Sequence, residues 1–255
     1  MDGFRAGTVR VWLIRSDLTP AVLAECHDRL DPAQRRRAAE FLDPVHRQRF
    51  IAAHGSANGI LACHYGLDPE HIRWRYGDSG KPSLDLPGLP ANGLYVNLSH
   101  SADLAAFAVS VGREVGVDLQ WCSPDLPVER LSQRYYPERE ARYVAAAATA
   151  GDAVSRFVRL WVRKEAVVKA AGGRLTRSLA LPVTGSVVGA TGCGMVVQGP
   201  SLAGPYRVCD IDSPPGFHAA VSLHGALPFT ATTQRWPPPP APADHEVRGP
   251  KPRRS

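Results

Sequence analysis

A helical pattern late in the chain places the tightest constraint on its fold. Residues 157–172 read FVRLWVRKEAVVKAAG, and their apolar members recur at steps of three and four. This spacing predicts an amphipathic helix with one buried stripe, because a helix completes a turn in 3.6 residues. The stripe consists of Phe157, Leu160, Trp161, Val168 and Ala171.

An aromatic, an acidic and a basic side chain lie at the border of that stripe. Trp161, Glu165 and Lys169 are spaced four apart, so they stack along one edge of the predicted helix. A carboxylate there could bind a metal ion, and an ammonium one turn later could hold a phosphate. The alternative is a surface ion pair, since Glu four residues before Lys is a favoured orientation worth about 0.2–0.5 kcal/mol. The helix alone leaves both interpretations open.

Length and composition indicate a globular protein. With 255 residues, 44% hydrophobic and 21% charged, the chain can bury a full core in one large or two small domains. No apolar run reaches the roughly 18 residues that span a bilayer, and the N-terminus lacks a signal-peptide pattern, so we expect a cytoplasmic protein without a membrane partner. The cysteines form no CxxC pair, which argues against a disulfide framework or a zinc site. They are Cys26, Cys63, Cys122, Cys193 and Cys209.

The net charge of +6 is unevenly distributed. The last 21 residues contain five basic and two acidic side chains, which accounts for half of the net charge. The remainder is spread over a large body, so we expect no nucleic-acid partner. Because this end of the chain is rich in proline and poor in apolar residues, we predict a disordered basic tail over residues 231–255.

The N-terminal part combines strands with basic helices. Residues 8–14 predict a strand, and Asp31 followed by Pro32 predicts a helix start. That helix contains Arg37, and a second helix over residues 45–65 contains Arg49. These arginines face either a ligand or solvent.

A turn and a strand connection follow the basic helices. The sequence GDSGKP predicts a turn that displays Lys81. Residues 94–98 and 105–111 predict two strands, with Ser99, His100 and Ser101 in the turn between them. Two hydroxyls and an imidazole in three residues could form an oxyanion or phosphate cradle, although a single histidine in such a turn often has no special role.

Strict alternation marks residues 114–120, which read EVGVDLQ. Asp118 and Gln120 therefore share one face of a predicted strand, and Gly116 leaves open space beside them. A carboxylate and an amide oxygen suit Mg²⁺, which takes one or two protein carboxylates together with water and substrate phosphate. The alternative is the solvent face of an antiparallel edge strand.

The C-terminal part repeats the mixture of helices and strands. Pro137 predicts a helix start, Gly151 and Asp152 are expected to break the helix before residue 157, and residues 183–224 contain short β segments. Two blocks of roughly 110 residues, 1–112 and 113–230, are therefore predicted as related α+β halves.

Four of these stretches, in order, resemble one known family. GKP at 80–82, NLSHS at 97–101, GVDLQ at 116–120 and WVRKEAVVKAAG at 161–172 are similar to the 4′-phosphopantetheinyl transferase family, in its single-chain, surfactin-type branch. The resemblance covers most of residues 8–227. It implies an α+β fold of two similar halves, a pseudo-dimer in one chain with the active site at their junction, and a monomer.

The resemblance also implies roles for individual residues. Asp118 and Glu165 match the magnesium ligands, and Gln120 stands where the family usually has Glu, so it is a weak ligand or acts through water. Lys169 matches the lysine near the diphosphate of coenzyme A. Gln34 stands where a related protein has another lysine. The coenzyme A contacts implied are Arg37, Arg49, Lys81, Ser99, His100 and Lys169.

The implied reaction transfers 4′-phosphopantetheine from coenzyme A, the co-substrate, to a serine of an apo acyl or peptidyl carrier protein and releases 3′,5′-ADP with Mg²⁺ as cofactor. Lys169 and His100 would stabilise charge on phosphate oxygens, and Glu165 is the candidate proton acceptor. The alternative is a non-catalytic basic module that binds nucleic acid or an acidic carrier-protein surface. A P-loop or dinucleotide enzyme is not supported, because GxxxxGK[ST] and GxGxxG are absent.

Overall fold

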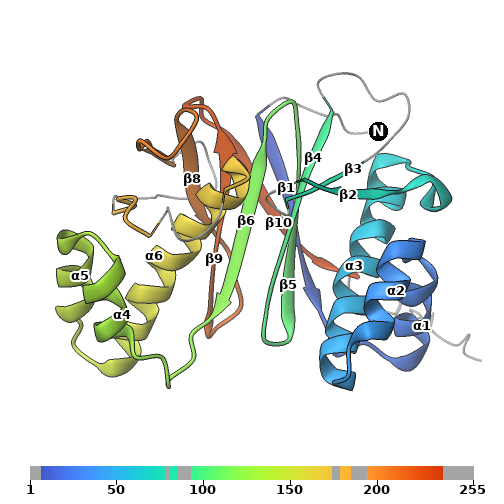
Figure 1. Cartoon of the computed structure of the whole chain (residues 1–255), viewed down its shortest axis with the longest axis horizontal. Coiled ribbons are helices and arrows are strands. Elements are labelled where there is room, and N and C mark those ends of the chain that lie inside the picture. Colours follow the sequence, from blue (N-terminus) through green and yellow to red (C-terminus); the bar gives the residue numbers. More distant parts are fainter. Residues whose placement is uncertain (1–6, 78–80, 85–92, 174–178, 185–193, 238–255) are drawn as a thin grey trace, which may run out of the picture.

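The computed structural model describes residues 7–77, 81–84, 93–173, 179–184 and 194–237 (Figure 1). The helices are α1 (Pro20–Asp28), α2 (Pro32–Glu40), α3 (Pro44–Tyr65), α4 (Val128–Tyr135), α5 (Glu138–Ala145) and α6 (Ala150–Ala171), with a 3₁₀ turn at Pro69–His71. The strands are β1 (Thr8–Arg15), β2 (Trp74–Tyr76), β3 (Pro82–Leu84), β4 (Leu94–Ser101), β5 (Leu104–Val111), β6 (Val115–Trp121), β7 (Met195–Val197), β8 (Tyr206–Ile211), β9 (Phe217–His224) and β10 (Thr230–Trp236).

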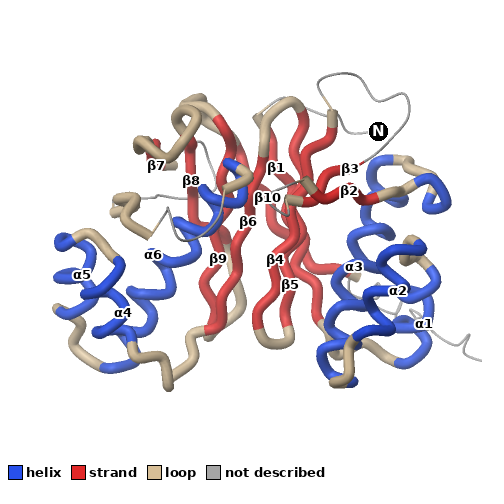
Figure 2. The backbone as a smooth tube through the Cα atoms, viewed as in Figure 1, coloured by secondary structure: helices blue, strands red, loops and turns tan. Residues whose placement is uncertain are grey.

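The architecture is a mixed α+β fold with two central sheets. One sheet has the strand order β10-β1-β5-β4 and the other β6-β9-β8-β7, while β2 and β3 form a small ribbon. Helices α1 to α3 cover the outer side of the first sheet and α4 to α6 that of the second (Figure 2). The inner faces of the sheets therefore meet in the middle of the molecule.

The core between the sheets follows from the two-residue period of the strands. Val115, Val117 and Leu119 of β6 belong to one buried cluster with Val9 and Val11 of β1. The predicted alternation of residues 114–120 is thus confirmed on its apolar side.

The two long helices have the same length and the same ending. Helices α3 and α6 each span 22 residues. Each ends at a glycine in the left-handed region, Gly66 with φ 64° and Gly172 with φ 66°. Glycine suits this position because it has no Cβ to clash there. In both parts of the chain, a strand, this long helix and a hairpin follow one another, with the matching orders β1-β5-β4 and β6-β9-β8.

The starts of α2 and α3, each marked by an aspartate cap followed by proline, were predicted correctly. Asp31 accepts from the backbone nitrogen of Gln34 at 2.8 Å in a full capping box, and Asp43 accepts from Val45 at 2.7 Å. Helix α1 was missed although Thr19 caps it and Pro20 begins it, and α4, which has no side-chain cap, was missed as well. The expected break at Gly151 and Asp152 is wrong, since Thr149 caps α6 there by accepting from the backbone of Asp152 at 3.1 Å.

Two strand boundaries also differ from prediction. Strand β4 runs through Ser101, so Ser99 and His100 lie in the strand, and the turn is at 102–103, with Ala102 at φ 51°. Residues 231–236, predicted as the start of a disordered tail, form most of β10. This strand pairs in parallel with β1, and its β-branched threonines suit an extended conformation. Its Trp236 ring lies 5.7 Å from that of His64. Residues 238–255 and 185–193, where a tail and a strand were predicted, lie outside the described residues.

No helix within the described part of the chain is long and apolar enough to cross a bilayer.

Candidate functional site

Three predicted site residues meet where the two sheets join. The Ser99 hydroxyl donates to Asp118 Oδ1 at 2.7 Å. Lys169 Nζ donates to the same oxygen at 2.6 Å and to Ser99 Oγ at 2.9 Å. Asp118 and Ser99 are each 5% exposed. Strand β4, strand β6 and the last turn of helix α6 thus each contribute one member of a compact polar triangle.

Side chains of β4 hydrogen-bond to the unpaired edge of β6, and these bonds bring the three residues together. Asn97 Oδ1 accepts from the backbone nitrogen of Val117 at 2.9 Å, and Ser101 Oγ accepts from that of Trp121 at 3.0 Å. Ser99 Oγ lies between them, 3.4 Å from the backbone nitrogen of Leu119. The polar residues of NLSHS thus replace a neighbouring strand for β6, whose edge would otherwise be unpaired. Sequence reasoning missed Asn97, although its two-residue spacing from Ser99 and Ser101 was visible.

The hydroxyls of Ser99 and Ser101 are therefore not a free anion cradle. Both already bind β6, and Ser99 also binds Asp118 and Lys169. Successive residues of a strand point to opposite faces, so His100 lies on the other side of β4.

Gly116 lets helix α6 pack directly on β6. A Cβ at this position would lie 2.1 Å from the Ala166 carbonyl oxygen and 2.3 Å from the Ala170 nitrogen. The predicted open space beside Gly116 is thus filled by the helix backbone. Strand β6 is an edge strand of its sheet, but its Asp118 face is covered by helix α6, so this face is not the solvent face of the alternative interpretation.

Glu165 lies beside this triangle. Burial, and next the negative charge of Asp118, raise its pKa to about 7, while Lys169 opposes the shift. Lys169 pairs with Asp118 on a different element. The alternative of a surface Glu165–Lys169 ion pair therefore does not describe this site.

Two carboxylate oxygens at this site fit a cation. Asp118 Oδ2 and Glu165 Oε1 are buried and have no hydrogen-bond partner among the described residues. Orphaned buried oxygens of this kind are rare, and a shared divalent cation would satisfy both. The described residues contain no group of three or more His, Cys, Asp or Glu arranged for a metal. Two carboxylates completed by water and substrate phosphate match the way Mg²⁺ binds.

Gln120 occupies the next position on the same face of β6. Its amide nitrogen donates to the Trp121 carbonyl oxygen at 3.3 Å, and its side chain is half-buried. It lines an apolar cavity of about 660 Å³. The other lining residues are Leu126, Leu131, Arg134, Tyr135, Tyr136, Phe157, Val158, Trp161, Leu179 and Ala180.

His100 and Arg49 lie together on the N-terminal side of the site. Partial burial lowers the pKa of His100, and the charges of Lys169 and Arg49 lower it further. Arg49 and His100 also line one small cavity. The positive charges of Arg49 and Lys169, close to an imidazole whose lowered pKa keeps it neutral near pH 7, favour an anion in this region.

The remaining predicted contacts are engaged elsewhere. Lys81 donates to a Glu114 carboxylate oxygen and, at 2.8 Å, to the Ala170 carbonyl oxygen at the end of α6. Arg37 pairs with Glu40 of its own helix at 2.8 Å. Gln34 is buried and accepts from the Asp31 backbone, so it stabilises the start of α2.

A larger cavity of about 970 Å³ lies beside β8, β9 and β10, and none of the predicted site residues lines it. Volume alone therefore does not identify the site. The unpartnered oxygens Asp118 Oδ2 and Glu165 Oε1 lie elsewhere, on β6 and α6.

Comparison with known proteins finds similarity to one family of enzymes. Residues 114–187 match the family described as the 4′-phosphopantetheinyl transferase superfamily. The 4′-phosphopantetheinyl transferase HetI of Nostoc sp. is 33% identical over 170 residues, which covers 66% of this chain and 70% of that protein. The Escherichia coli 4′-phosphopantetheinyl transferase AcpT is 36% identical over 127 residues, 50% of this chain and 59% of that protein. The 4′-phosphopantetheinyl transferase gsp of Aneurinibacillus migulanus is 29% identical over 103 residues, 40% and 39% of the two chains.

Proposed function

Because this chain belongs to the 4′-phosphopantetheinyl transferase superfamily, we propose that it transfers 4′-phosphopantetheine from coenzyme A to a serine hydroxyl of an apo carrier protein. It is an enzyme of that class. The finer assignment is the single-chain, surfactin-type branch, with two similar α+β halves as a pseudo-dimer. The matching strand orders β1-β5-β4 and β6-β9-β8 support that assignment.

The observation that supports this function most strongly is the pair of orphaned oxygens, Asp118 Oδ2 and Glu165 Oε1. We assign both carboxylates to one Mg²⁺, with Gln120 contributing through its amide oxygen or through water. When bound, the ion would withdraw charge from the diphosphate of coenzyme A and hold its phosphates in line.

The chain's own residues account for the rest of the chemistry. The serine oxygen attacks the phosphorus on the pantetheine side, the bond from that phosphorus to the leaving 3′,5′-ADP breaks, and Glu165 takes the serine proton directly or through a water. Without a metal, burial raises the pKa of Glu165 to about 7. A bound cation would lower that pKa again, so the carboxylate would be ionised at neutral pH and able to accept the proton. Lys169 and His100 stabilise the negative charge on the phosphate oxygens.

The two sides of the site suit the two substrates. We place phosphates of coenzyme A on the side of His100, where Arg49 and Lys169 supply positive charge. The apolar cavity beside Gln120 is where we place the carrier protein, and one of its lining side chains, Tyr135, is 41% exposed. Arg37 and Lys81 are proposed as further coenzyme A contacts, for which Lys81 would have to share its charge with Glu114.

The deciding experiment incubates the protein with coenzyme A, Mg²⁺ and an apo acyl carrier protein, followed by intact-mass measurement. We expect the carrier to gain the mass of one phosphopantetheine group, and the gain to disappear with EDTA. A non-catalytic basic module would instead bind the carrier or nucleic acid without Mg²⁺, with an affinity that falls steeply with salt, and the carrier mass would not change.

A further inference from the structure

Residues 179–184 run beside helix α6 without helix or strand structure of their own. Leu179 and Ala180, at the start of this segment, line the apolar cavity next to Gln120. A segment without backbone pairing depends on other contacts for a fixed position.

Three buried side chains hold the backbone of this segment. Lys164 donates to the Leu181 carbonyl oxygen. Arg163 Nη1 donates to the Val183 carbonyl oxygen at 3.1 Å, and Glu140 Oε1 accepts from the Val183 nitrogen at 2.5 Å. We call these three side chains, Glu140, Arg163 and Lys164, the clamp.

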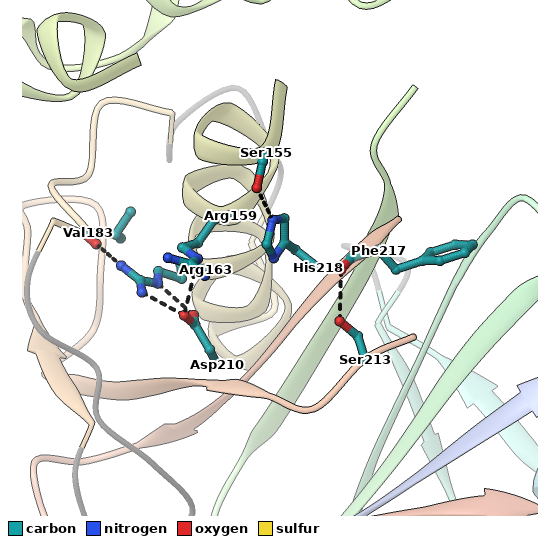
Figure 3. A network of polar contacts seen from close by, with 8 residues as sticks. All are labelled: Ser155, Arg159, Arg163, Val183, Asp210, Ser213, Phe217 and His218. Atoms are coloured by element: carbon teal, nitrogen blue, oxygen red, sulfur yellow. Dashed lines mark hydrogen bonds and ion pairs between the residues drawn. The ribbon is translucent and has the colours of Figure 1, made fainter. Parts of the chain in front are cut away.

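The clamp is itself fixed to the fold on both sides. Arg163 makes two hydrogen bonds of 2.7 Å to the carboxylate of Asp210 on β8 (Figure 3). Lys164 Nζ lies 2.6 Å from Glu140 Oε2 of α5 and 4.7 Å from the centre of the Tyr136 ring. The segment is therefore tied to helix α5, helix α6 and the second sheet at once.

The ion pair between Lys164 and Glu140 buries two charges in the core, which has a large desolvation cost. Lys164 is 0% exposed and Glu140 1%. Replacing a buried ion pair with apolar residues of similar volume is often neutral or stabilising, so stability alone does not explain this pair. What apolar side chains could not supply is the set of hydrogen bonds to Leu181 and Val183.

The location of the clamp connects it with the site. Lys164 directly precedes Glu165 on α6, and Tyr136 lines the same cavity as Leu179 and Ala180. The clamp thus holds the segment that contributes Leu179 and Ala180 to the cavity lining against helix α6.

We propose that Lys164 and Glu140 are positioning residues that fix the wall of the cavity at Leu179 and Ala180, the surface on which a carrier protein docks. This inference rests on the proposed function. Neither residue touches the reacting atoms. Their loss is expected to affect recognition of the carrier protein and to leave the use of coenzyme A unchanged.

The test separates positioning from stability. Lys164→Met leaves Glu140 buried without its partner and is expected to lower the Tm by about 10 °C. The double variant Glu140→Leu with Lys164→Met removes both charges, and its Tm is expected to return to within about 3 °C of the wild type. Its KM for apo acyl carrier protein should nevertheless rise at least about tenfold, the cost of roughly one lost buried hydrogen bond. Its KM for coenzyme A should change less than about twofold, as expected for a site the clamp does not touch.

A matched pair on the same helix α5 serves as control. Glu138 and Arg142 form an exposed ion pair at 3.3 Å, so Glu138→Leu with Arg142→Met should leave the Tm and both KM values unchanged. A double clamp variant with wild-type KM for the carrier, or with a loss confined to kcat, overturns the positioning role. A wild-type protein that adds no mass to the carrier overturns the proposed function as well, so the two failures are distinguishable.

Discussion

The two halves of the molecule follow the same plan but fill the helix-facing side of their first strand differently. The C-capping glycines of α3 and α6, Gly66 and Gly172, are 106 positions apart. The same offset relates Trp12 of β1 to Asp118 of β6. Both side chains face the long helix of their own half, yet Trp12 is a fully buried part of an apolar cluster and Asp118 belongs to a polar site. One scaffold thus supports either an apolar core or a charged site.

The helix positions differ in the same way. At the same offset, Gly59 and Cys63 of α3 correspond to Glu165 and Lys169 of α6. A Cβ on Gly59 would approach the side chains of Arg29 and Trp236, so this part of α3 is covered by neighbouring elements. The equivalent position on α6 holds a carboxylate with an orphaned oxygen. At these positions the N-terminal half has a packed glycine and an exposed cysteine, whereas the C-terminal half has the two residues to which we assign chemistry.

The largest expected effect tests the charged side of this comparison. Asp118→Ala and Glu165→Ala should each lower kcat/KM at least about 10²–10³-fold, as loss of a group that stabilises transition-state charge does. Cys63→Ala, at the position in α3 that corresponds to Lys169, should leave kcat/KM unchanged. Carrier-mass kinetics at fixed Mg²⁺ measure the rates, and circular dichroism checks the fold. Near-normal turnover in either carboxylate variant would refute the site.

The second effect tests the apolar side. Trp12→Ala should lower the free energy of unfolding by about 3–5 kcal/mol, because it opens a large cavity in the core against α3. Below the transition, kcat per folded molecule should stay close to the wild type. Urea denaturation measures the change, and Trp121→Ala, at a ring that is 43% exposed, is the stability control. A Trp12→Ala variant as stable as the wild type would contradict the division of roles between the halves.

The structural features behind these predictions differ in how far the sequence alone indicated them. The stripe of α6 and the alternation of β6 were predictable, since each is a local period of one element. The contact of Ser99 with Asp118 was not, because it depends on how an edge of one sheet meets another sheet. β10 was missed for the same reason, since its partner β1 lies more than 200 residues earlier. The burial of Lys164 with Glu140 contradicts the usual preference of both residues for the surface, so no local pattern indicated it.

The third effect is a pH dependence of the stability of the metal-free protein. The pKa of Glu165 is raised from 4.5 to about 7 in the fold, so the folded state holds its proton more tightly than the unfolded chain. Stability from this group is complete below about pH 4.5 and is lost as the pH rises through about 7, with an expected change of about 1–3 kcal/mol. In EDTA, the Tm should fall between pH 5 and pH 8, values on either side of that pKa.

The control variants separate Glu165 from other carboxylates. Glu165→Gln should remove most of the slope of Tm against pH, because an amide does not titrate. Glu129→Gln, on an exposed residue in the first turn of α4, should leave the slope unchanged. A slope that persists in Glu165→Gln would show that another group is responsible.

The smallest effect concerns Gln120, which the same offset relates to Ile14. Ile14 is 1% exposed in the apolar cluster against α3, whereas Gln120 is half-buried at the edge of the cavity, next to Asp118. Gln120→Glu adds a third carboxylate to the proposed site, beside Asp118 on β6 and Glu165 on α6. The Mg²⁺ concentration for half-maximal activity should therefore fall about 3–10-fold, because added negative charge strengthens the binding of a hard cation. Gln120→Ala should raise it no more than about threefold if the amide is a weak ligand or acts through water. Magnesium titration of the carrier-mass assay measures both variants, and a wild-type magnesium requirement in Gln120→Glu would place the cation away from this face of β6.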